Sequence, residues 1–222
     1  MKVLVTRPEP GASATAMRLV AMGHEPVLAP CLEITFLPVH LPEHPAALII
    51  TSGQAIGALP GRLRDVPVFC VGDATAGRLR AAGFGRVESA SGDANDLFKL
   101  VTARHRPGTH VMAVGERHGL ALCRQLRAAG IQVLRRKVYV AKPLRKLPAV
   151  AEAMLARHEI GAVLFYSAET ARSFMRLAPG STETMLACAL SPAVAEALHG
   201  LPWAQIRVAL GPSEADLMAL LA

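Results

Sequence analysis

Three short segments combine small residues, hydroxyl groups and backbone N–H groups at predicted turns from strand to helix. They are Thr51-Ser52, Gly72-Asp73-Ala74-Thr75 and Tyr166-Ser167. Helix N-termini present free N–H groups and the positive end of the helix dipole, both of which attract carboxylate and phosphate groups. The turns therefore indicate a site for an anionic ligand. Plain helix capping by Ser52, Asp73 and Ser167 explains the same residue types equally well, and the two roles are compatible.

Cations lie close to these turns and along one extended segment. Arg7 directly follows the first predicted strand, where its guanidinium suits a carboxylate partner; a solvated arginine is the alternative. Further cations cluster around residues 135–146: Arg135, Arg136, Lys137, Lys142, Arg145 and Lys146. We expect some of them, Lys142 included, to attract an anionic substrate, although solvated charges on an edge strand produce the same pattern.

The sequence offers little for metal or disulfide chemistry. His40 and His44 are four residues apart, but prolines interrupt the helix that would bring them together. The cysteines are Cys31, Cys70, Cys123 and Cys188. They have no CxxC-like spacing and lie in or beside apolar runs, so we expect small core residues in a reducing compartment.

Length and charge narrow the class of protein. A chain of 222 residues forms one large domain or two small ones. Its longest apolar runs are too short to cross a membrane, and its N-terminus lacks the apolar stretch of a secretory signal, so we expect a cytoplasmic protein. The net charge of +7 suits an anionic metabolite, nucleic acid or an anionic membrane surface. Without a zinc finger, a basic helix or an aromatic-basic stretch, nucleic acid ranks behind an anionic metabolite.

Short β-rich apolar runs alternate with segments of helical periodicity along the whole chain. The runs are 2–6, 46–51, 66–72, 110–114 and 161–166, and each precedes a predicted helix. Gly23, Gly83 and Gly130 fit helix C-termini. The alternation predicts an α/β fold with mostly parallel sheets.

Two modules each occur twice, in the order A, B, A′, B′. Module A begins at Val3 as VLVTRPEPG and recurs at Val111 as VMAVGERHG. Module B contains TSGQAI, CVGDATAGRLRAAGF and SGDANDL in its first copy, and YSAETA, ALSPAVAEALHGL and GPSEADL in its second. A β-rich segment follows each A module, at 31–38 and 136–144. Two strands crossing side by side between two lobes explain these segments; two contiguous lobes, 1–107 and 108–222, are the alternative.

The order and spacing of several motifs resemble the uroporphyrinogen-III synthase family over nearly the whole chain. The motifs are VLVTRP, PCLEI, TSGQAI, VGDATAGRLRAAGF, SGDANDL, VY at 138–139 and FYSAETARSF. The resemblance implies two small parallel-sheet α/β lobes joined by a two-stranded linker, the first lobe being discontinuous in sequence. Lobe one would comprise 1–30 and 146–222 and lobe two 41–134, with linker strands at 31–40 and 135–145.

The resemblance also implies an enzyme of porphyrin and heme biosynthesis. Such a lyase cyclises the linear tetrapyrrole hydroxymethylbilane with loss of water and inverts ring D through a spiro intermediate, giving uroporphyrinogen III. The pyrroles supply the electrons, so no metal or redox cofactor is expected. The protein has to bind an octacarboxylate, fold it and assist loss of hydroxide. We expect a monomer without nucleic-acid or membrane partners, to which the preceding enzyme of the pathway could transiently hand over the substrate.

On this resemblance, Tyr139 of the VY motif is the candidate catalytic residue. It would lie on the second linker strand and face a cleft between the lobes. A phenol is a good hydrogen-bond donor at neutral pH and would protonate or orient the departing hydroxyl. Packing of an amphipathic aromatic ring at the hinge is the alternative. Tyr166 is the other tyrosine of the chain.

One turn departs from the family pattern. Relatives often carry a threonine in the ALSPAVAEAL region, where this chain has Ala193 and Val194, while the first copy of the phrase has Thr75. Ser191 then supplies the hydroxyl group at this turn, and backbone N–H groups would have to make the other contacts with the substrate. We expect the lobe with Thr75 to hold the substrate more firmly. A catalytically inactive relative that binds tetrapyrroles or other anions is the alternative function.

Overall fold

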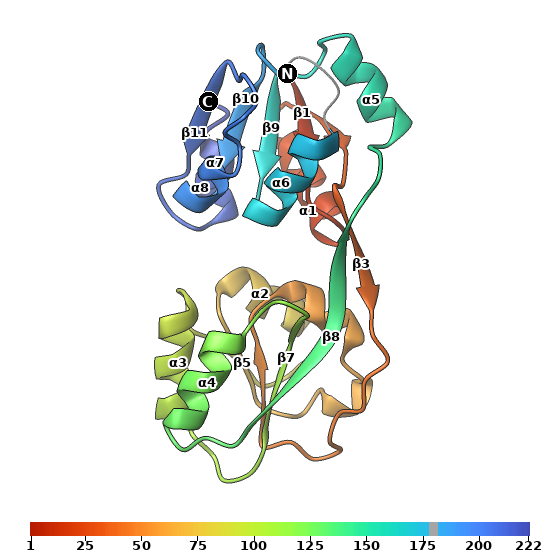
Figure 1. Cartoon of the computed structure of the whole chain (residues 1–222). Helices are drawn as coiled ribbons and strands as arrows, with labels where there is room; N and C mark the ends of the chain where they lie inside the picture. The colour runs from red at the N-terminus through yellow and green to blue at the C-terminus, as the bar shows by residue number, and fades with distance from the viewer. Residues whose placement is uncertain (178–181) are drawn as a thin grey trace. The chain divides into compact units, whose positions relative to one another are not determined.

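The computed structural model describes residues 1–177 and 182–222, and the chain divides into two compact units. Unit 1 comprises Met1–Glu33 and Lys142–Ala222, and unit 2 comprises Ile34–Ala141. Each unit is a β-sheet with helices packed against it (Figure 1). The predicted α/β class is confirmed, with a first unit that is discontinuous in sequence.

The sheet of unit 1 has the strand order β11-β10-β9-β1-β2, and all of these neighbours are parallel. The strands are β1 (Lys2–Val5), β2 (Glu25–Leu28), β9 (Ala162–Phe165), β10 (Leu186–Ala189) and β11 (Gln205–Val208). The helices are α1 (Gly11–Ala21), α5 (Ala149–Ala156), α6 (Ala168–Leu177), α7 (Pro192–Glu196) and α8 (Glu214–Ala219). The central strands are continuously apolar because both faces of a parallel sheet are buried.

Alternate residues of β1 face different helical layers. Leu4 packs with Phe174 of α6 on one face, whereas Val5 packs with Leu19 of α1 and Leu217 of α8 on the other. All five side chains are completely buried. Burial of one such side chain contributes about 1.5–3 kcal/mol, so β1 is held from both sides.

The sheet of unit 2 has the strand order β3-β8-β7-β4-β5-β6. The strands are β3 (Leu32–Phe36), β4 (Ala47–Ile50), β5 (Val68–Cys70), β6 (Val87–Ser89), β7 (His110–Gly115) and β8 (Val133–Pro143). The helices are the short 3₁₀ segments η1 (Gly53–Ala58) and η2 (Gly61–Leu63), with α2 (Asp73–Ala81), α3 (Ala94–Ala103) and α4 (Leu120–Ala128). The pairs among β4, β5, β6, β7 and β8 are parallel.

Strands β3 and β8 carry the chain from one unit to the other, as the predicted two-stranded linker requires. The N–H group of Leu37 donates to the Val138 carbonyl oxygen at 3.0 Å. Beyond the unit boundary, the N–H group of Leu144 donates to the Cys31 carbonyl oxygen at 3.0 Å.

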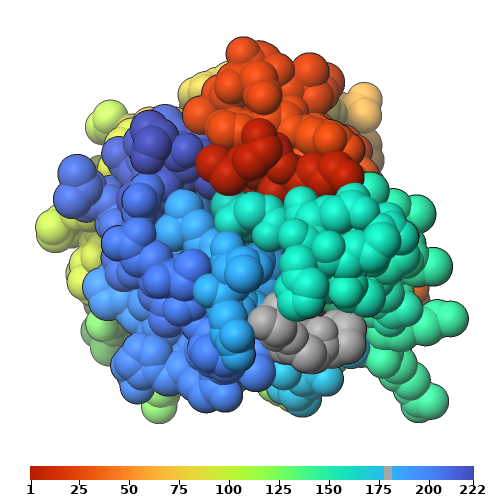
Figure 2. All heavy atoms as spheres, turned by 90° about the horizontal axis from the view of Figure 1, so that it is seen from above, coloured from red at the N-terminus to blue at the C-terminus, as the bar shows by residue number. Residues whose placement is uncertain are grey.

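Each unit uses strands from both halves of the chain, which excludes two contiguous lobes. β1 pairs with β9 in unit 1, and β4 pairs with β7 in unit 2. The N–H group of Gly161 donates to the Lys2 carbonyl oxygen at 3.0 Å, and the Lys2 ammonium pairs with Glu159. In the space-filling view the N-terminal residues (red) accordingly lie against residues near 160 (teal; Figure 2).

The repeated modules fold alike. In both units the three strands of module B are followed across the sheet by the two strands of module A, giving β11-β10-β9-β1-β2 and β6-β5-β4-β7-β8. Gly72, the N-cap of α2, has φ −154° and ψ 166°, and Ser191, the N-cap of α7, has φ −156° and ψ 165°. Asp93 and Ser213 cap α3 and α8 at equivalent places in the repeat. The duplicated phrase therefore encodes one turn geometry twice.

The helix expected after the strand at 46–51 is a 3₁₀ segment, η1, and this expectation was wrong in type. Gly57 of η1 lies so close to the ring of Phe36 that a Cβ atom would approach it to 2.5 Å. Pro60 follows directly and cannot donate to a continuing α-helix. Two glycines within η1 further weaken α-helical propensity.

The four cysteines are free and buried, which confirms that they are core residues. Burial raises the pKa of the Cys31 and Cys188 thiols to about 12, so neither is a thiolate nucleophile at neutral pH. In the part of the chain that the structure describes, no helix has both the length and the apolar character needed to span a bilayer.

His110 makes unit 2 sensitive to acid. It is completely buried at the start of β7, its ring stacks on His105 at 5.6 Å, and its Nε2 atom has no hydrogen-bond partner among the described residues. Burial lowers the pKa of His110 below the ordinary value of 6.5. The charge of His105 also lowers this pKa, whereas the hydrogen bond to the Gly108 carbonyl raises it, without outweighing burial. The unfolded chain therefore binds the proton more readily, and stability is lost as the pH falls below about 6.5.

We predict that the free energy of unfolding in urea falls between pH 7.5 and pH 5.5, by up to about 1.4 kcal/mol for each unit of pKa depression. In His110→Leu, which cannot titrate at this position, the fall should be smaller. His44→Leu removes an exposed histidine and should behave as the wild type does. Equal pH dependence in all three proteins would show that His110 is not the group responsible.

Candidate functional site

Both sheets have a topological switch point, where the chain leaves neighbouring strands in opposite directions. In unit 1 the chain passes from β1 to β2 on one side and from β9 to β10 on the other. In unit 2 the same reversal separates β4 from β7. In open α/β sheets, ligands bind beyond the carboxyl ends of the strands at such points. The predicted binding turns after β1, β4, β5, β9 and β10 all lie on these carboxyl edges.

A hydrogen-bonded cluster fills the switch point of unit 1. Glu214, the first residue of α8, accepts hydrogen bonds at one carboxylate oxygen from Thr15 (2.5 Å), Tyr166 (2.7 Å) and Arg7 (3.2 Å). Its other oxygen pairs with Arg18 at 2.9 Å. The guanidinium carbon of Arg7 also lies 3.9 Å from the centre of the Tyr166 ring, a cation–π contact.

The sequence allows this close arrangement through Gly11. A Cβ atom on Gly11, the first residue of α1, would lie 2.4 Å from Nε of Arg7. Glycine therefore lets the Arg7 side chain lie against the start of the helix. The carboxylate that Arg7 contacts in the structure is that of Glu214, and binding of a substrate carboxylate by Arg7 stays a prediction.

Glu214 is an ionised carboxylate at neutral pH. Burial alone would raise its pKa, but the hydrogen bonds from Thr15 and Tyr166 and the charges of Arg7 and Arg18 outweigh burial and hold the pKa below 4.5. Burial, reinforced by Glu214, raises the pKa of Tyr166, which stays a neutral donor. The cluster thus holds two arginines and one carboxylate beside a neutral phenol.

The turns of unit 2 are more open. Ser52 caps η1, its hydroxyl oxygen accepting from the N–H group of Gln54 at 3.3 Å, and Thr51 beside it is half-buried. A Cβ atom on Gly72 would meet no heavy atom within 4 Å. Ala74 is exposed and Thr75 half-buried in the first turn of α2. Small residues thus leave space in front of the N-terminus of α2.

Asp73 is fully exposed at the start of α2. It accepts a hydrogen bond from the Ser91 hydroxyl at 2.9 Å. Hydrogen bonding lowers the pKa of Asp73, with the larger effect from Ser89 and the smaller from Ser91. An ionised carboxylate repels an anionic ligand. The contribution that Asp73 can make to anion binding is therefore its backbone N–H group.

Sequence reasoning missed Arg78 at this turn. A Cβ atom on Gly53 would lie 2.9 Å from a guanidinium nitrogen of Arg78, so the side chain extends from α2 to the turn after β4. The spacing could have shown it, because Arg78 is three residues after Thr75 and lies on the same helix face. Glu214 gave no comparable signal, since it is 207 residues from Arg7.

Tyr139 lies on β8 within unit 2 and is 4% exposed. Its ring packs with the apolar layer around Ile50 and Ala113. Gly115 at the end of β7 faces the phenol: a Cβ atom there would lie 2.7 Å from the ring and 2.9 Å from the hydroxyl oxygen. Glycine at position 115 therefore lets the Tyr139 ring and hydroxyl lie against the end of β7.

The remaining predicted residues lie on unit 1. Ser167 accepts from the N–H group of Thr170 at 3.2 Å and thereby caps α6. Ser191 is half-buried at the N-cap of α7 but makes no capping bond through its side chain. Lys142 is exposed near the end of β8. The structure brings Arg7 together with the turn that holds Ser167, through the contact with Tyr166.

Comparisons with known proteins agree on one family. The family model described as Uroporphyrinogen-III synthase HemD matches residues 13–219. The solved uroporphyrinogen-III synthetase of Helicobacter pylori 26695 is 17% identical with a TM-score of 0.66, covering 99% of this chain and 97% of that one. A mutant uroporphyrinogen III synthase of Thermus thermophilus is 19% identical with a TM-score of 0.51, covering 100% and 96%. Among curated proteins, none matches this chain.

We predict that Glu214→Gln lowers the free energy of unfolding by about 1–3 kcal/mol at pH 7, because Arg7 is then left largely buried without its counter-ion. The matched control is Glu196→Gln, which alters an exposed carboxylate and should change stability by about 0.5 kcal/mol or less. The difference in free energy of unfolding between wild type and Glu214→Gln should shrink as the pH falls from 4.5 to below the lowered pKa of Glu214. Over this range the carboxylate of the native protein becomes protonated and loses its charge. A difference that persists undiminished in acid would contradict the charge-based account.

Proposed function

The chain belongs to the uroporphyrinogen-III synthase family, and we propose that the turns on the carboxyl edges of its two sheets bind the tetrapyrrole substrate. The protein is an enzyme, a carbon–oxygen lyase that cyclises hydroxymethylbilane with loss of water and inversion of ring D to give uroporphyrinogen III. The observation that carries this conclusion is the family match over residues 13–219, which spans both units.

Unit 2 makes the firmer contacts in this proposal. The nine-residue helix α2 presents the N–H groups of its first turn beside Gly72, where space is open. The hydroxyl groups of Ser52 and Thr75 and the backbone of Asp73 and Ala74 add neutral donors. Such donors bind carboxylates without requiring a permanent counter-charge.

Unit 1 contributes more weakly. Helix α7 has five residues, so little dipole supports the turn at Ser191. Ser167 is engaged as a cap, and Arg7 is engaged with Glu214. A substrate carboxylate reaches Arg7 only by competing with Glu214. Lys142, exposed on β8, adds attraction through its charge.

Tyr139 acts on the departing hydroxyl in our proposal. Its phenol is a hydrogen-bond donor at neutral pH, and glycine at position 115 lets it lie against the end of β7. Its burial removes competing water and strengthens the hydrogen bonds that it makes. A monomeric state, a cytoplasmic location and handover from the preceding enzyme of the pathway stay predictions.

The activity is tested by the isomer that forms. Hydroxymethylbilane cyclises spontaneously to the type I isomer, so we predict that adding the protein diverts the product to type III, as resolved by chromatography after oxidation to porphyrins. Heat-denatured protein is the control. Type I product alone in the presence of folded protein would refute the activity, and tight binding without turnover would indicate an inactive relative.

The role of Tyr139 is tested against Tyr166, the only other tyrosine. We predict that Tyr139→Phe lowers the rate of type III formation by about 10²-fold, the contribution typical of a proton donor. Tyr166→Phe, which removes a hydroxyl from the Glu214 cluster, should lower it far less. Urea unfolding of both variants checks the fold. An unchanged rate in a folded Tyr139→Phe variant would remove Tyr139 from the chemistry.

A further inference from the structure

A cavity of about 520 Å³ lies at the amino edge of the unit 2 sheet. Pro67 and Arg86 come directly before β5 and β6, and Arg104 and Arg106 follow α3; all four line it, together with Phe69 and Glu88. The candidate substrate turns leave the opposite ends of the same strands. A three-residue strand spans about 10 Å, so the cavity is separate from the site described above.

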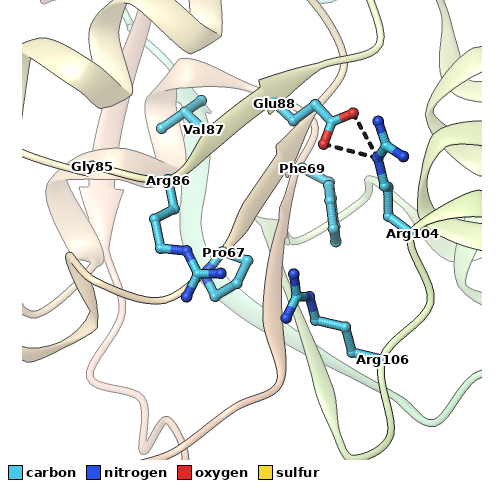
Figure 3. Close-up of a pocket in the computed structure, with 8 residues that line it drawn as sticks. All are labelled: Pro67, Phe69, Gly85, Arg86, Val87, Glu88, Arg104 and Arg106. Atoms are coloured by element: carbon cyan, nitrogen blue, oxygen red, sulfur yellow. Dashed lines mark hydrogen bonds and ion pairs between the residues drawn. The ribbon is translucent and has the colours of Figure 1, made fainter.

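The cavity carries a surplus of positive charge. Glu88 accepts two hydrogen bonds from Nε of Arg104, at 3.0 and 3.2 Å. Within residues 1–177 and 182–222, neither Arg86 nor Arg106 has an acidic partner. Three guanidinium groups and one carboxylate leave two positive charges. Figure 3 shows the guanidinium groups of Arg86 and Arg106 extending from different segments into the same space beside Pro67 and Phe69.

Helix electrostatics explain only part of this arrangement. The C-terminus of α3 carries partial negative charge, which favours Arg104 there. The same dipole gives no reason for Arg86, which comes from the other side of the cavity at the start of β6. The α3 dipole therefore does not account for Arg86, whereas Arg106, like Arg104, follows the C-terminus of that helix.

We propose that Arg86, Arg104 and Arg106 form an arginine pocket that binds a small dianion bearing carboxylate or phosphate groups. Guanidinium forks match both groups in bidentate geometry, and two such forks balance two negative charges. The volume lies in the range of small-molecule sites. Phe69 and Pro67 supply an apolar wall for the body of the ligand. The proposal does not depend on the proposed function, because the two sites share no residue.

Arginine-specific labelling with phenylglyoxal, read by peptide mass spectrometry on the full chain, tests the pocket. The probes are inorganic phosphate and succinate, each at ionic strength matched with sodium chloride. A probe at a concentration about nine times its dissociation constant should slow modification of Arg86 and Arg106 about tenfold. Arg86, Arg104 and Arg106 are exposed, and Arg117 and Arg124, exposed arginines of the same unit outside the pocket, serve as internal references.

The outcomes separate the ligand sources. Selective protection by succinate assigns the pocket to carboxylates, the groups that the tetrapyrroles carry; protection by phosphate assigns it to phosphorylated metabolites; protection by both assigns it to dianions in general. No protection, or equal slowing at Arg117 and Arg124, overturns the proposal.

Two variants sharpen the test. Glu88→Gln removes the one negative charge and frees Arg104, so protection of Arg86 should require several-fold less probe, whereas Glu116→Gln, an exposed acid elsewhere on unit 2, should change nothing. Arg86→Ala should abolish protection of Arg106 and leave type III synthesis unchanged. Loss of type III synthesis in folded Arg86→Ala beside an active wild type would overturn the assignment of a separate site. Absence of type III synthesis in the wild type itself would bear on the proposed function and not on the pocket.

Discussion

The parallel pairing of β1 with β9 is the constraint on which unit 1 depends. It joins residues 3–5 to residues 162–164 and thereby builds the first strand into the core of the C-terminal half. Because the chain leaves β1 and β9 in opposite directions, their carboxyl ends open into one switch point. Tyr166 follows β9 directly and Arg7 lies two residues after β1, and the contact between their side chains is a consequence of the pairing.

The same topology carries different chemistry in the two units. Three positions of the repeat correspond across the units: Arg7 to Gly115, Tyr166 to Thr51 and Glu214 to Ala94. One switch point is consequently filled by an ionic cluster of two arginines and one carboxylate, and the other is lined by small residues that let Tyr139 lie against Gly115 and leave space at the N-terminus of α2. Duplication supplied the scaffold, and side-chain size divided the roles.

Patterns local in sequence were predictable, and contacts between distant segments were not. The strands followed from apolar runs, and the turn at Gly72 and Ser191 followed from a repeated phrase. The segment η1 was missed because its conformation depends on contact between Gly57 and Phe36, which periodicity does not report. Glu214 was hidden for a similar reason, because its partners Arg7 and Thr15 lie at the other end of the chain.

The chemistry of the reaction limits what charge can contribute. The carboxylates are ionised in the substrate and in the transition state alike, so a contact with a carboxylate that does not move during the reaction is equally strong in both. Uniform binding of this kind lowers the concentration of substrate that is needed to saturate the enzyme but does not lower the barrier of the chemical step. The attraction that a net charge of +7 exerts on an anionic substrate therefore favours its capture rather than the chemical step. Acceleration has to come from groups that act on the departing hydroxyl or on the folded conformation of the chain of pyrroles, and this is the reason for proposing a neutral donor such as Tyr139 rather than a further arginine.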